Sequence, residues 1–139
     1  MALLRLLAED AEDLPVIASA TQDAVTKIGD IVYEAKSRRL TVSMNRYRWE
    51  GAGEERVRSA LQIGGVLDVK ARRLRRTAKE AILELLSLDF TPSEAPGGVL
   101  TFQFAGGGDL AVTVECVDAV LADLSEPWST PRIPKHDTP

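Results

Sequence analysis

The chain has 139 residues, of which 45% are hydrophobic and 27% charged, values that are ordinary for one soluble globular domain. Its formal net charge of −4 argues against a dedicated DNA-binding protein, which usually carries a positive charge on its binding domain. The single cysteine, Cys116, excludes an intramolecular disulfide, and the start of the chain lacks the features of a signal peptide, so we expect a cytoplasmic protein.

We expect a single α+β domain over residues 1–126, built from a mostly antiparallel β-sheet with one N-terminal amphipathic helix packed against it. A C-terminal tail over 127–139 follows, which we expect to be irregular or disordered because of its closely spaced prolines. No apolar run approaches the ~20 residues of a membrane span, so we expect no membrane contact.

The N-terminal region predicts a short strand followed by the clearest helix of the chain. Leu3–Leu7 is a short apolar run, typical of a buried strand. Asp10 or Asp13 can cap the helix that follows, and Pro15 suits its first turn. We predict the helix over Glu12–Gln22, because one helical face collects the side chains of Leu14, Ile17, Ala18 and Thr21.

The middle of the chain alternates apolar and polar residues, which is the period of a half-buried strand. Ile28–Lys36 and Leu40–Asn45 predict a hairpin, and Val57–Ile63 predicts a further strand. Gly64-Gly65 then indicates a bulge or a sharp bend before the β pattern resumes over Val66–Lys70.

Thr77–Leu86 supports two interpretations. Its first four residues have the pattern of a capping box before an apolar run, which predicts a helix. The region that follows, Ile82–Phe90, also has the composition of a strand, one that ends at Pro92. We favour a turn over the first five residues and then a strand, because a second hairpin follows.

That second hairpin joins Val99–Phe104 to Leu110–Cys116 through a turn at Gly106–Gly108. A glycine-rich loop can also cradle phosphate, but such a loop opens a helix, whereas this one connects two strands. Cys116 lies on the apolar parity of the second strand, so we expect a small buried hydrophobe and not a nucleophile.

The sequence offers no set of catalytic or metal-binding residues. His136 is the only histidine, so histidine-based triads and metal sites are not expected. Acidic pairs such as Glu9-Asp10 and Glu54-Glu55 lie in loops or at the helix start, where surface carboxylates and caps are usual. We therefore expect no enzymatic activity, no catalytic residues, no cofactor and no metal.

Positive charge is concentrated in the middle of the chain. Residues 36–76 include twelve basic and four acidic residues, a local charge of +8, whereas the flanking segments carry −5 and −7. Basic strands can lie beside acidic ones and be neutralised within the sheet. Alternatively, an exposed basic face can bind an anionic partner. We favour neutralisation and keep both interpretations.

A basic and aromatic rim is the candidate binding surface. If Leu40, Val42 and Met44 face the core, we expect the strand to leave the core near Asn45. Arginine grips phosphate, and tyrosine and tryptophan stack on bases; the alternative is a solvated strand edge whose charges prevent aggregation. The candidate binding residues are Arg46, Tyr47, Arg48, Trp49, Arg72, Arg73, Arg75 and Arg76.

Three stretches together carry a family resemblance: residues 4–10 with Asp13-Leu14, residues 22–25 through Gly29-Asp30 to 45–50, and residues 104–108 leading to 114–117. The chain resembles a family of small alphaproteobacterial proteins known only as a domain of unknown function. The likeness covers nearly all of the chain up to the tail. It implies no activity, substrate or cofactor.

The sequence alone assigns no function. We expect a small non-catalytic interaction or regulatory module that binds an unknown protein partner or forms a homodimer through an exposed strand edge. The alternative is a nucleic-acid-binding accessory protein that uses the arginine-rich central strands to hold an anionic partner such as RNA. An enzyme is the least expected class.

Overall fold

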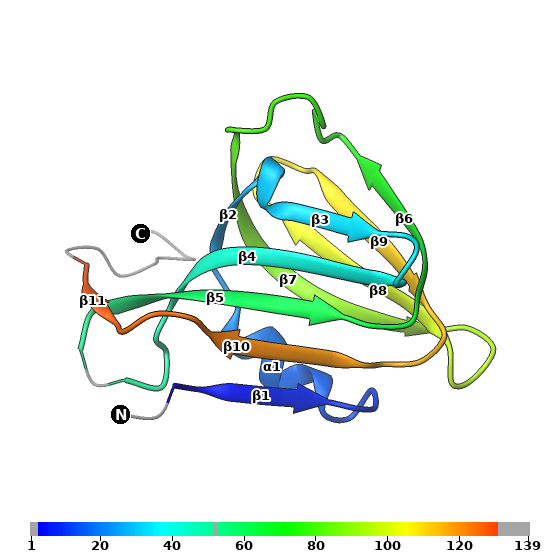
Figure 1. Ribbon diagram of the computed structural model, residues 1–139, viewed down its shortest axis with the longest axis horizontal. Coiled ribbons are helices and arrows are strands. Elements are labelled where there is room, and N and C mark those ends of the chain that lie inside the picture. The colour runs from blue at the N-terminus through cyan, green and yellow to red at the C-terminus, as the bar shows by residue number, and fades with distance from the viewer. Residues whose placement is uncertain (1–2, 52, 131–139) are drawn as a thin grey trace.

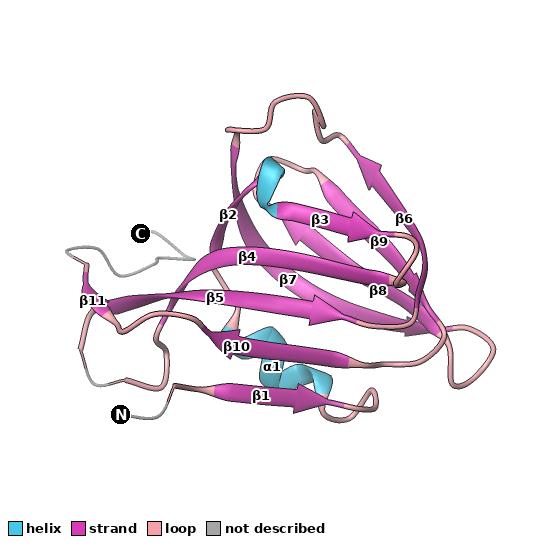
Figure 2. Cartoon of the chain, in the orientation of Figure 1, coloured by secondary structure: helices cyan, strands magenta, loops and turns pink. Residues whose placement is uncertain are grey.

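The computed structural model of the chain describes residues 3–51 and 53–130. These residues form a mostly antiparallel sheet, as the sequence predicts, with one short α-helix, α1 (Leu14–Ala20), and one turn of 3-10 helix, η1 (Ile28–Asp30), as Figure 2 shows. The strands are β1 (Arg5–Ala8), β2 (Val25–Lys27), β3 (Ile31–Glu34), β4 (Arg39–Tyr47), β5 (Glu55–Ile63), β6 (Val66–Arg72), β7 (Ile82–Pro92), β8 (Gly98–Phe104), β9 (Asp109–Val114), β10 (Ala119–Asp123) and β11 (Trp128–Ser129).

The strands lie in the order β1-β10-β5-β4-β2-β7-β8-β9-β6, with β3 paired to β4 and β11 paired to β5. The sheet is open and strongly curved, so β1, β10, β5 and β4 face β7, β8, β9 and β6 across the core (Figure 1). The short strand β2 pairs with both β4 and β7 and joins the two halves. The first strand of the chain therefore lies beside a strand from its C-terminal region.

The alternation of side chains along the strands builds the core. In β4, Leu40, Val42 and Met44 point inward and are buried, and in β8 Leu100 and Phe102 do the same. Each side chain of this kind contributes about 1.5–3 kcal/mol of hydrophobic free energy when it is fully removed from water. The inward alternation of β4 continues past Met44, so the next residue of the series, Arg46, also lies on the core side of the strand.

Helix α1 is shorter than the predicted span of 12–22. Leu14 and Ile17 are buried, and the helix lies against β1 and β7. It ends because Thr21 donates its hydroxyl hydrogen bond to the carbonyl of Ile17 at 3.0 Å and Asp23 takes a left-handed φ of 63°. At the other end the predicted side-chain cap is not formed: the Asp13 N–H donates to Asp10 Oδ1 at 3.0 Å in a separate turn.

Of the two predicted alternatives for Gly64-Gly65, a bulge or a sharp bend, the structure has the bend. The Gly64 N–H donates to the carbonyl of Asp118 at 2.9 Å, and a Cβ there would lie 2.5 Å from Asp118 Oδ2. Gly65 has a φ of +63°, in the left-handed region that favours glycine. The chain thus leaves β5 in one half of the sheet and enters β6 in the other.

The ambiguous region after residue 77 is a turn over 77–81 followed by strand β7. The favoured interpretation is confirmed, because β7 pairs with β8 over nearly its whole length, from Leu85↔Phe104 to Pro92↔Gly98. The second predicted hairpin is also present. Its strands β8 and β9 are joined by a glycine turn in which the Phe104 N–H donates to the Gly108 carbonyl at 2.9 Å.

The regular structure extends past the predicted domain end at residue 126. Trp128 and Ser129 pair with Arg56 and Glu55 as strand β11. The rest of the expected tail, residues 131–139, lies outside the described residues. Among the residues described, no helix has the length and apolar composition needed to cross a bilayer.

Candidate functional site

Arg46 does not lie on an exposed rim, so that prediction was wrong. Its side chain is fully buried on the inner face of β4, and its Nε and Nη2 both donate to the carboxylate of Asp123 at 2.9 Å. Ser59 donates its hydroxyl to the same carboxylate at 2.6 Å, and Glu50 closes the other side with contacts of 3.0 and 2.7 Å to Arg46. The arginine fits the core because β5 and β10 bring acceptors to it.

These contacts shift the pKa values of two groups in the network, Arg46 and Glu50. Burial alone would lower the pKa of Arg46, but hydrogen bonds to Glu50 and Asp123 outweigh it and raise the pKa above its usual range. The hydrogen bond from Arg46 lowers the pKa of Glu50 in turn, against the opposing effect of its partial burial. Both groups stay charged at neutral pH and form a structural ion-pair network.

The rest of the predicted rim is largely engaged within the fold. Arg48 is half-buried and bonds to Glu55. The ring of Tyr47 is buried and lies 4.7 Å, centroid to centroid, from that of Trp49, at 60°. The Trp49 indole N–H donates to the carbonyl of Gln22 at 3.0 Å, so its orientation is fixed against the segment after α1. No flat stacking platform of the kind predicted is formed by these side chains.

The other four predicted residues lie far from the end of β4: Arg72 ends β6, and Arg73, Arg75 and Arg76 follow on the connection between β6 and β7 (Figure 1). We call residues 72–76 the arginine loop. Leu74 packs against the core, and a Cβ at Gly108 would touch the side chain of Leu74 and lie 3.0 Å from the Arg73 carbonyl. The loop is therefore held down on the glycine turn at its centre.

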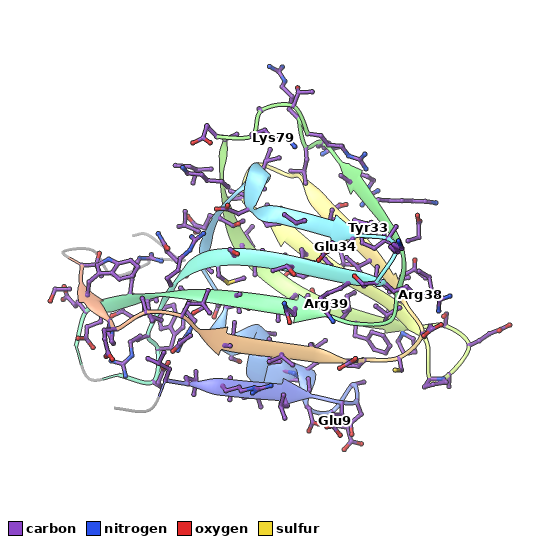
Figure 3. The ribbon with its side chains drawn as sticks, in the orientation of Figure 1. Glu9, Tyr33, Glu34, Arg38, Arg39 and Lys79 are labelled. Carbon is purple, nitrogen blue, oxygen red and sulfur yellow. The ribbon has the colours of Figure 1, made fainter. Side chains whose placement is uncertain are left out.

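Anchoring of Leu74 leaves charged side chains exposed on both sides of it. Within residues 3–51 and 53–130, Arg73, Arg75 and Arg76 form no ion pair. Lys79, labelled in Figure 3, lies on the same connection. The first residue of the loop is different, because Arg72 makes a bidentate contact with Asp109, at 3.0 Å from Nε to Oδ1 and 2.6 Å from Nη2 to Oδ2.

A small polar cavity of about 160 Å³ lies where the arginine loop meets the glycine turn, lined by Arg72, Arg73, Gly107 and Asp109. The hydrogen bond from Arg72 lowers the pKa of Asp109, and the charge of Arg73 acts in the same direction. The same bond raises the pKa of Arg72. The aspartate neutralises one arginine and orients it, while the positive charges of the loop still outnumber it.

Neutralisation within the fold applies to part of the basic middle segment, and other residues of the segment stay exposed. Arg38 bonds to Glu115 at 2.8 Å and Arg58 to Asp30 at 3.2 Å, so acidic side chains from the flanking segments neutralise them, as they do Arg46 and Arg72. Exposed pairs of this kind contribute little to stability. Among the described residues, exposed basic side chains without an ion pair remain on the arginine loop, at Arg73, Arg75 and Arg76, and near the turn between β3 and β4, at Lys36 and Arg39.

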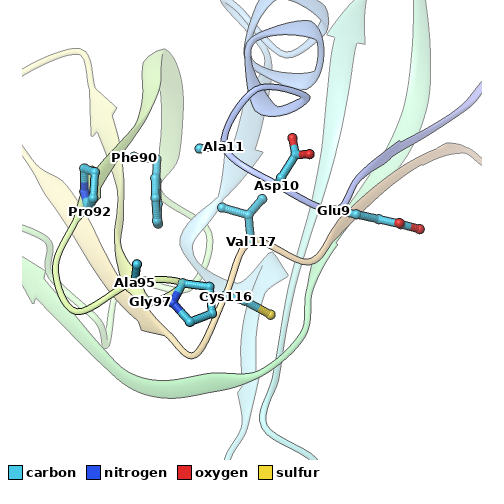
Figure 4. A pocket seen from close by; sticks show the side chains of 10 residues that line it. Glu9, Asp10, Ala11, Phe90, Pro92, Ala95, Gly97, Cys116 and Val117 are labelled. Carbon is cyan, nitrogen blue, oxygen red and sulfur yellow. The ribbon is translucent and has the colours of Figure 1, made fainter.

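Cys116 lines a separate pocket of about 280 Å³, shown in Figure 4. The walls of this pocket are mainly apolar, with Phe90, Pro96 and Val117 among them, and Glu9 lies at its edge. The thiol is half-buried and not fully buried as predicted, because β9 ends at Val114 and the alternation stops there. None of the residues lining the pocket is basic.

The acidic pairs that could have formed a catalytic dyad have structural partners. Asp10 accepts the turn hydrogen bond from Asp13, and Glu55 is bound by Arg48. In the part of the chain that the structure describes, no three histidine, cysteine, aspartate or glutamate side chains gather into a possible metal site. His136 lies outside the described residues.

Sequence reasoning missed the network around Arg46 although a signal was present. Ser59 lies in the inward series of β5 between Val57 and Leu61, and Asp123 lies on the inward parity of β10. A polar residue on the core parity of each of three strands indicates a buried polar cluster, because such groups require partners. The pairing of β5 with β4 and β10 then brings the three residues together.

Comparison with known proteins gives a match to a family model described as "Protein of unknown function (DUF2948)", over residues 4–136. Neither the comparison with curated proteins nor that with solved structures gives a match. The family match spans nearly the whole chain and brings no activity with it. A function must therefore be argued from the geometry of the side chains.

Proposed function

The chain belongs to the DUF2948 family, and we propose that this member is a non-catalytic binding module whose arginine loop holds an acidic segment of a partner protein. The observation that carries the proposal is the exposure of Arg73, Arg75 and Arg76 without an ion pair among the described residues. Guanidinium groups bind carboxylates through paired hydrogen bonds, and an anchored loop loses less freedom on binding.

The arrangement of the loop suits an extended acidic chain. Leu74 is partly buried and holds the centre of the loop, and the arginines on either side of it are exposed. Arg72 is already bonded to Asp109, which supports the base of the loop. A chain with several carboxylates can contact the arginines in turn, and each contact replaces water at little cost in loop order.

RNA is the alternative partner, and the geometry favours it less. Recognition of single-stranded RNA usually combines phosphate contacts with stacking of bases on aromatic side chains. The predicted aromatic residues Tyr47 and Trp49 lie at the end of β4, and the arginine loop itself contains none. The net charge of −4 opposes long-range attraction of RNA and of an acidic segment alike, so it does not separate the two partners.

The proposal keeps the protein in the cytoplasm of an alphaproteobacterium, without a cofactor. The single cysteine and the family resemblance support this placement. A non-catalytic role is supported by the structural partners of the candidate acids and by the apolar surroundings of Cys116.

Fluorescence anisotropy with two labelled probes, an octaglutamate peptide and a single-stranded RNA of mixed sequence, tests the proposal. We expect the peptide to bind and the double substitution Arg75→Gln/Arg76→Gln to weaken binding about tenfold, because two charge-assisted contacts are lost. Lys36→Gln/Arg39→Gln is the matched control, since it removes the same charge from exposed positions near the turn between β3 and β4.

The outcomes separate the alternatives. Loss of peptide binding in the loop variant alone supports the proposal. Tighter binding of RNA, with affinity that falls steeply as salt increases, would assign the loop to phosphate contacts and overturn the choice of a protein partner. Equal losses in both double variants, or no binding of either probe, would overturn the loop as a site.

A further inference from the structure

Strand β1 is one of the two end strands of the open sheet, and we propose that it pairs antiparallel with β1 of a second copy to form a two-fold dimer. An end strand presents unpaired main-chain groups, which are a template for another strand. This inference concerns a different surface from the arginine loop and does not depend on it.

The main-chain groups of β1 alternate in direction. The Leu4 carbonyl accepts a hydrogen bond from the Asp123 N–H at 2.9 Å, and the register continues through Leu6↔Leu121. In an antiparallel pair every second residue exchanges hydrogen bonds with its neighbour strand. The N–H and carbonyl groups of Arg5 and Leu7 therefore point away from β10, toward the free edge.

The side chains on the outer face of β1 are self-complementary. Arg5 and Glu9 are exposed, and Leu7, midway between them, is 55% exposed. Antiparallel pairing centred on Leu7 places Leu7 opposite Leu7 of the second copy. The same register places Arg5 of each copy opposite Glu9 of the other, so both ends of the pair join opposite charges.

The main-chain bonds of this register agree with the free groups. Leu7 of each copy donates to and accepts from Leu7 of the other, and the register brings Arg5 opposite Glu9, which lies one residue beyond β1 in a bend and would join the pairing. The Glu9 N–H now makes a long contact of 3.4 Å with Asp13 Oδ2, which a carbonyl of the second copy would replace. The pairing would extend the sheet continuously through two molecules.

The opposite end strand, β6, has features that oppose pairing with a strand of another molecule. It carries exposed charges at Asp68, Lys70 and Arg72 and has a register irregularity between Val66 and Asp68. Charged side chains and bulges of this kind oppose edge-to-edge pairing. Strand β1 has one charged residue and no bulge, and its charge is matched by Glu9 of a second copy.

An apolar groove beside β1 continues the proposed interface. It has a volume of about 370 Å³ and is lined by Leu4, Leu6, Val16 and Trp49, among others. Helix α1 lies directly behind β1 in Figure 1, and Val16 on this helix is exposed. A second copy that pairs with β1 would bring its own helix to this side and cover the apolar surface.

Sedimentation equilibrium of the full chain over a range of concentrations tests the dimer. We expect a monomer–dimer equilibrium for the natural sequence, and a dissociation constant raised at least about tenfold by Leu7→Lys, which places like charges on the two-fold axis. Leu67→Lys is the matched control, because Leu67 is 50% exposed on the other end strand. Circular dichroism of each variant verifies that it is folded.

A charge exchange tests the register. Arg5→Glu and Glu9→Arg should each weaken self-association, because each places like charges opposite one another across the axis. An equimolar mixture of the two variants should restore the dimer, since every facing pair in the mixed species is again of opposite charge. The double variant Arg5→Glu/Glu9→Arg should also dimerise.

A natural chain that stays monomeric at every concentration would overturn the proposal. A dimer that all of these substitutions leave unchanged would show that another surface is used, and would also overturn it. Unfolding of Leu7→Lys would not decide the matter, because the charge exchange at the exposed ends of the pair still gives an independent answer.

Discussion

The Arg46 guanidinium is the largest side chain fully enclosed in this fold, and its position follows from three strands. Met44 before it and Val57 across from it are apolar, whereas Ser59 and Asp123 supply acceptors on the same inner face. A buried charge without a partner costs several kcal/mol, so the arginine and the aspartate are tolerated only as a pair.

Removing either partner should therefore destabilise the protein more than removing both. We expect Arg46→Met and Asp123→Leu each to lower the free energy of unfolding by about 3–5 kcal/mol, because the first leaves the buried Asp123 without a charged partner and the second leaves Arg46 with Glu50 as its one remaining carboxylate. The double variant should cost clearly less than the sum. Equilibrium urea unfolding measures all three, with Arg39→Met at the exposed start of β4 as a control near zero. Strict additivity would show that the two side chains do not interact.

The sequence allows a prediction of which side chains of a strand face the core. It does not show whether a charged side chain in that series is buried or exposed. The inward series Leu40, Val42, Met44 was visible, and the next member was assigned to solvent because arginine is usually exposed. Arg46 is buried because Asp123, which is distant in the sequence, lies close to it in the sheet and accepts its hydrogen bonds. The sequence reasoning favoured neutralisation of the basic segment, whereas most of the arginine loop is exposed, since among the described residues the one carboxylate in an ion pair with it is that of Asp109, bound to Arg72.

At the scale of elements, the β7–β8 hairpin depends on a glycine at its closed end. Gly98 is buried opposite Pro92, and a Cβ there would overlap the Thr91 carbonyl and lie 2.6 Å from the Phe90 ring. Main chain and an aromatic ring give way less readily than a flexible side chain, so the position admits no larger residue.

We expect Gly98→Ala to lower the free energy of unfolding by about 1–3 kcal/mol, the usual cost of overpacking a tight site. Gly53→Ala is the control, because the nearest atom to its added Cβ is Glu55 Cγ at 3.8 Å. Thermal unfolding followed by circular dichroism compares the two variants with the natural chain. A melting temperature for Gly98→Ala equal to that of the control would contradict the predicted clash.

Strands were predicted well at this scale because their period-two pattern is local. The hairpins of β3 with β4 and of β8 with β9 follow from alternation and turn residues alone. The early end of α1 was not predicted, because it depends on the hydroxyl of Thr21 and the left-handed Asp23. The order of the strands also lay beyond the sequence, since it is fixed by contacts between distant segments.

The whole molecule has one continuous core although its sheet has two facing halves. Buried residues from β4 and β5 meet those of β8 and β9, and β2 links the halves by pairing with both. Thr26 in β2 adds a hydroxyl bond of 2.6 Å to the Ser43 carbonyl. Neither half can keep its apolar face covered without the other.

Unfolding should accordingly be a single cooperative transition. We expect far-UV circular dichroism and tryptophan fluorescence to give the same midpoint in urea. Trp128 lies in the two-residue strand β11 at the periphery, so Trp128→Phe leaves Trp49 as the reporter beside α1. A fluorescence transition well below the midpoint of the circular dichroism would reveal that the region around Trp49 unfolds independently.

The pairing of β1 with β10 also constrains how the protein can be made. Arg5–Ala8 leaves the ribosome well before its partner Ala119–Asp123, because the two segments are far apart in the sequence. At common translation rates the nascent segment waits on the order of ten seconds with its apolar residues unprotected. During that interval β1 has no β10 to pair with, so this part of the sheet can close only after Ala119–Asp123 has emerged.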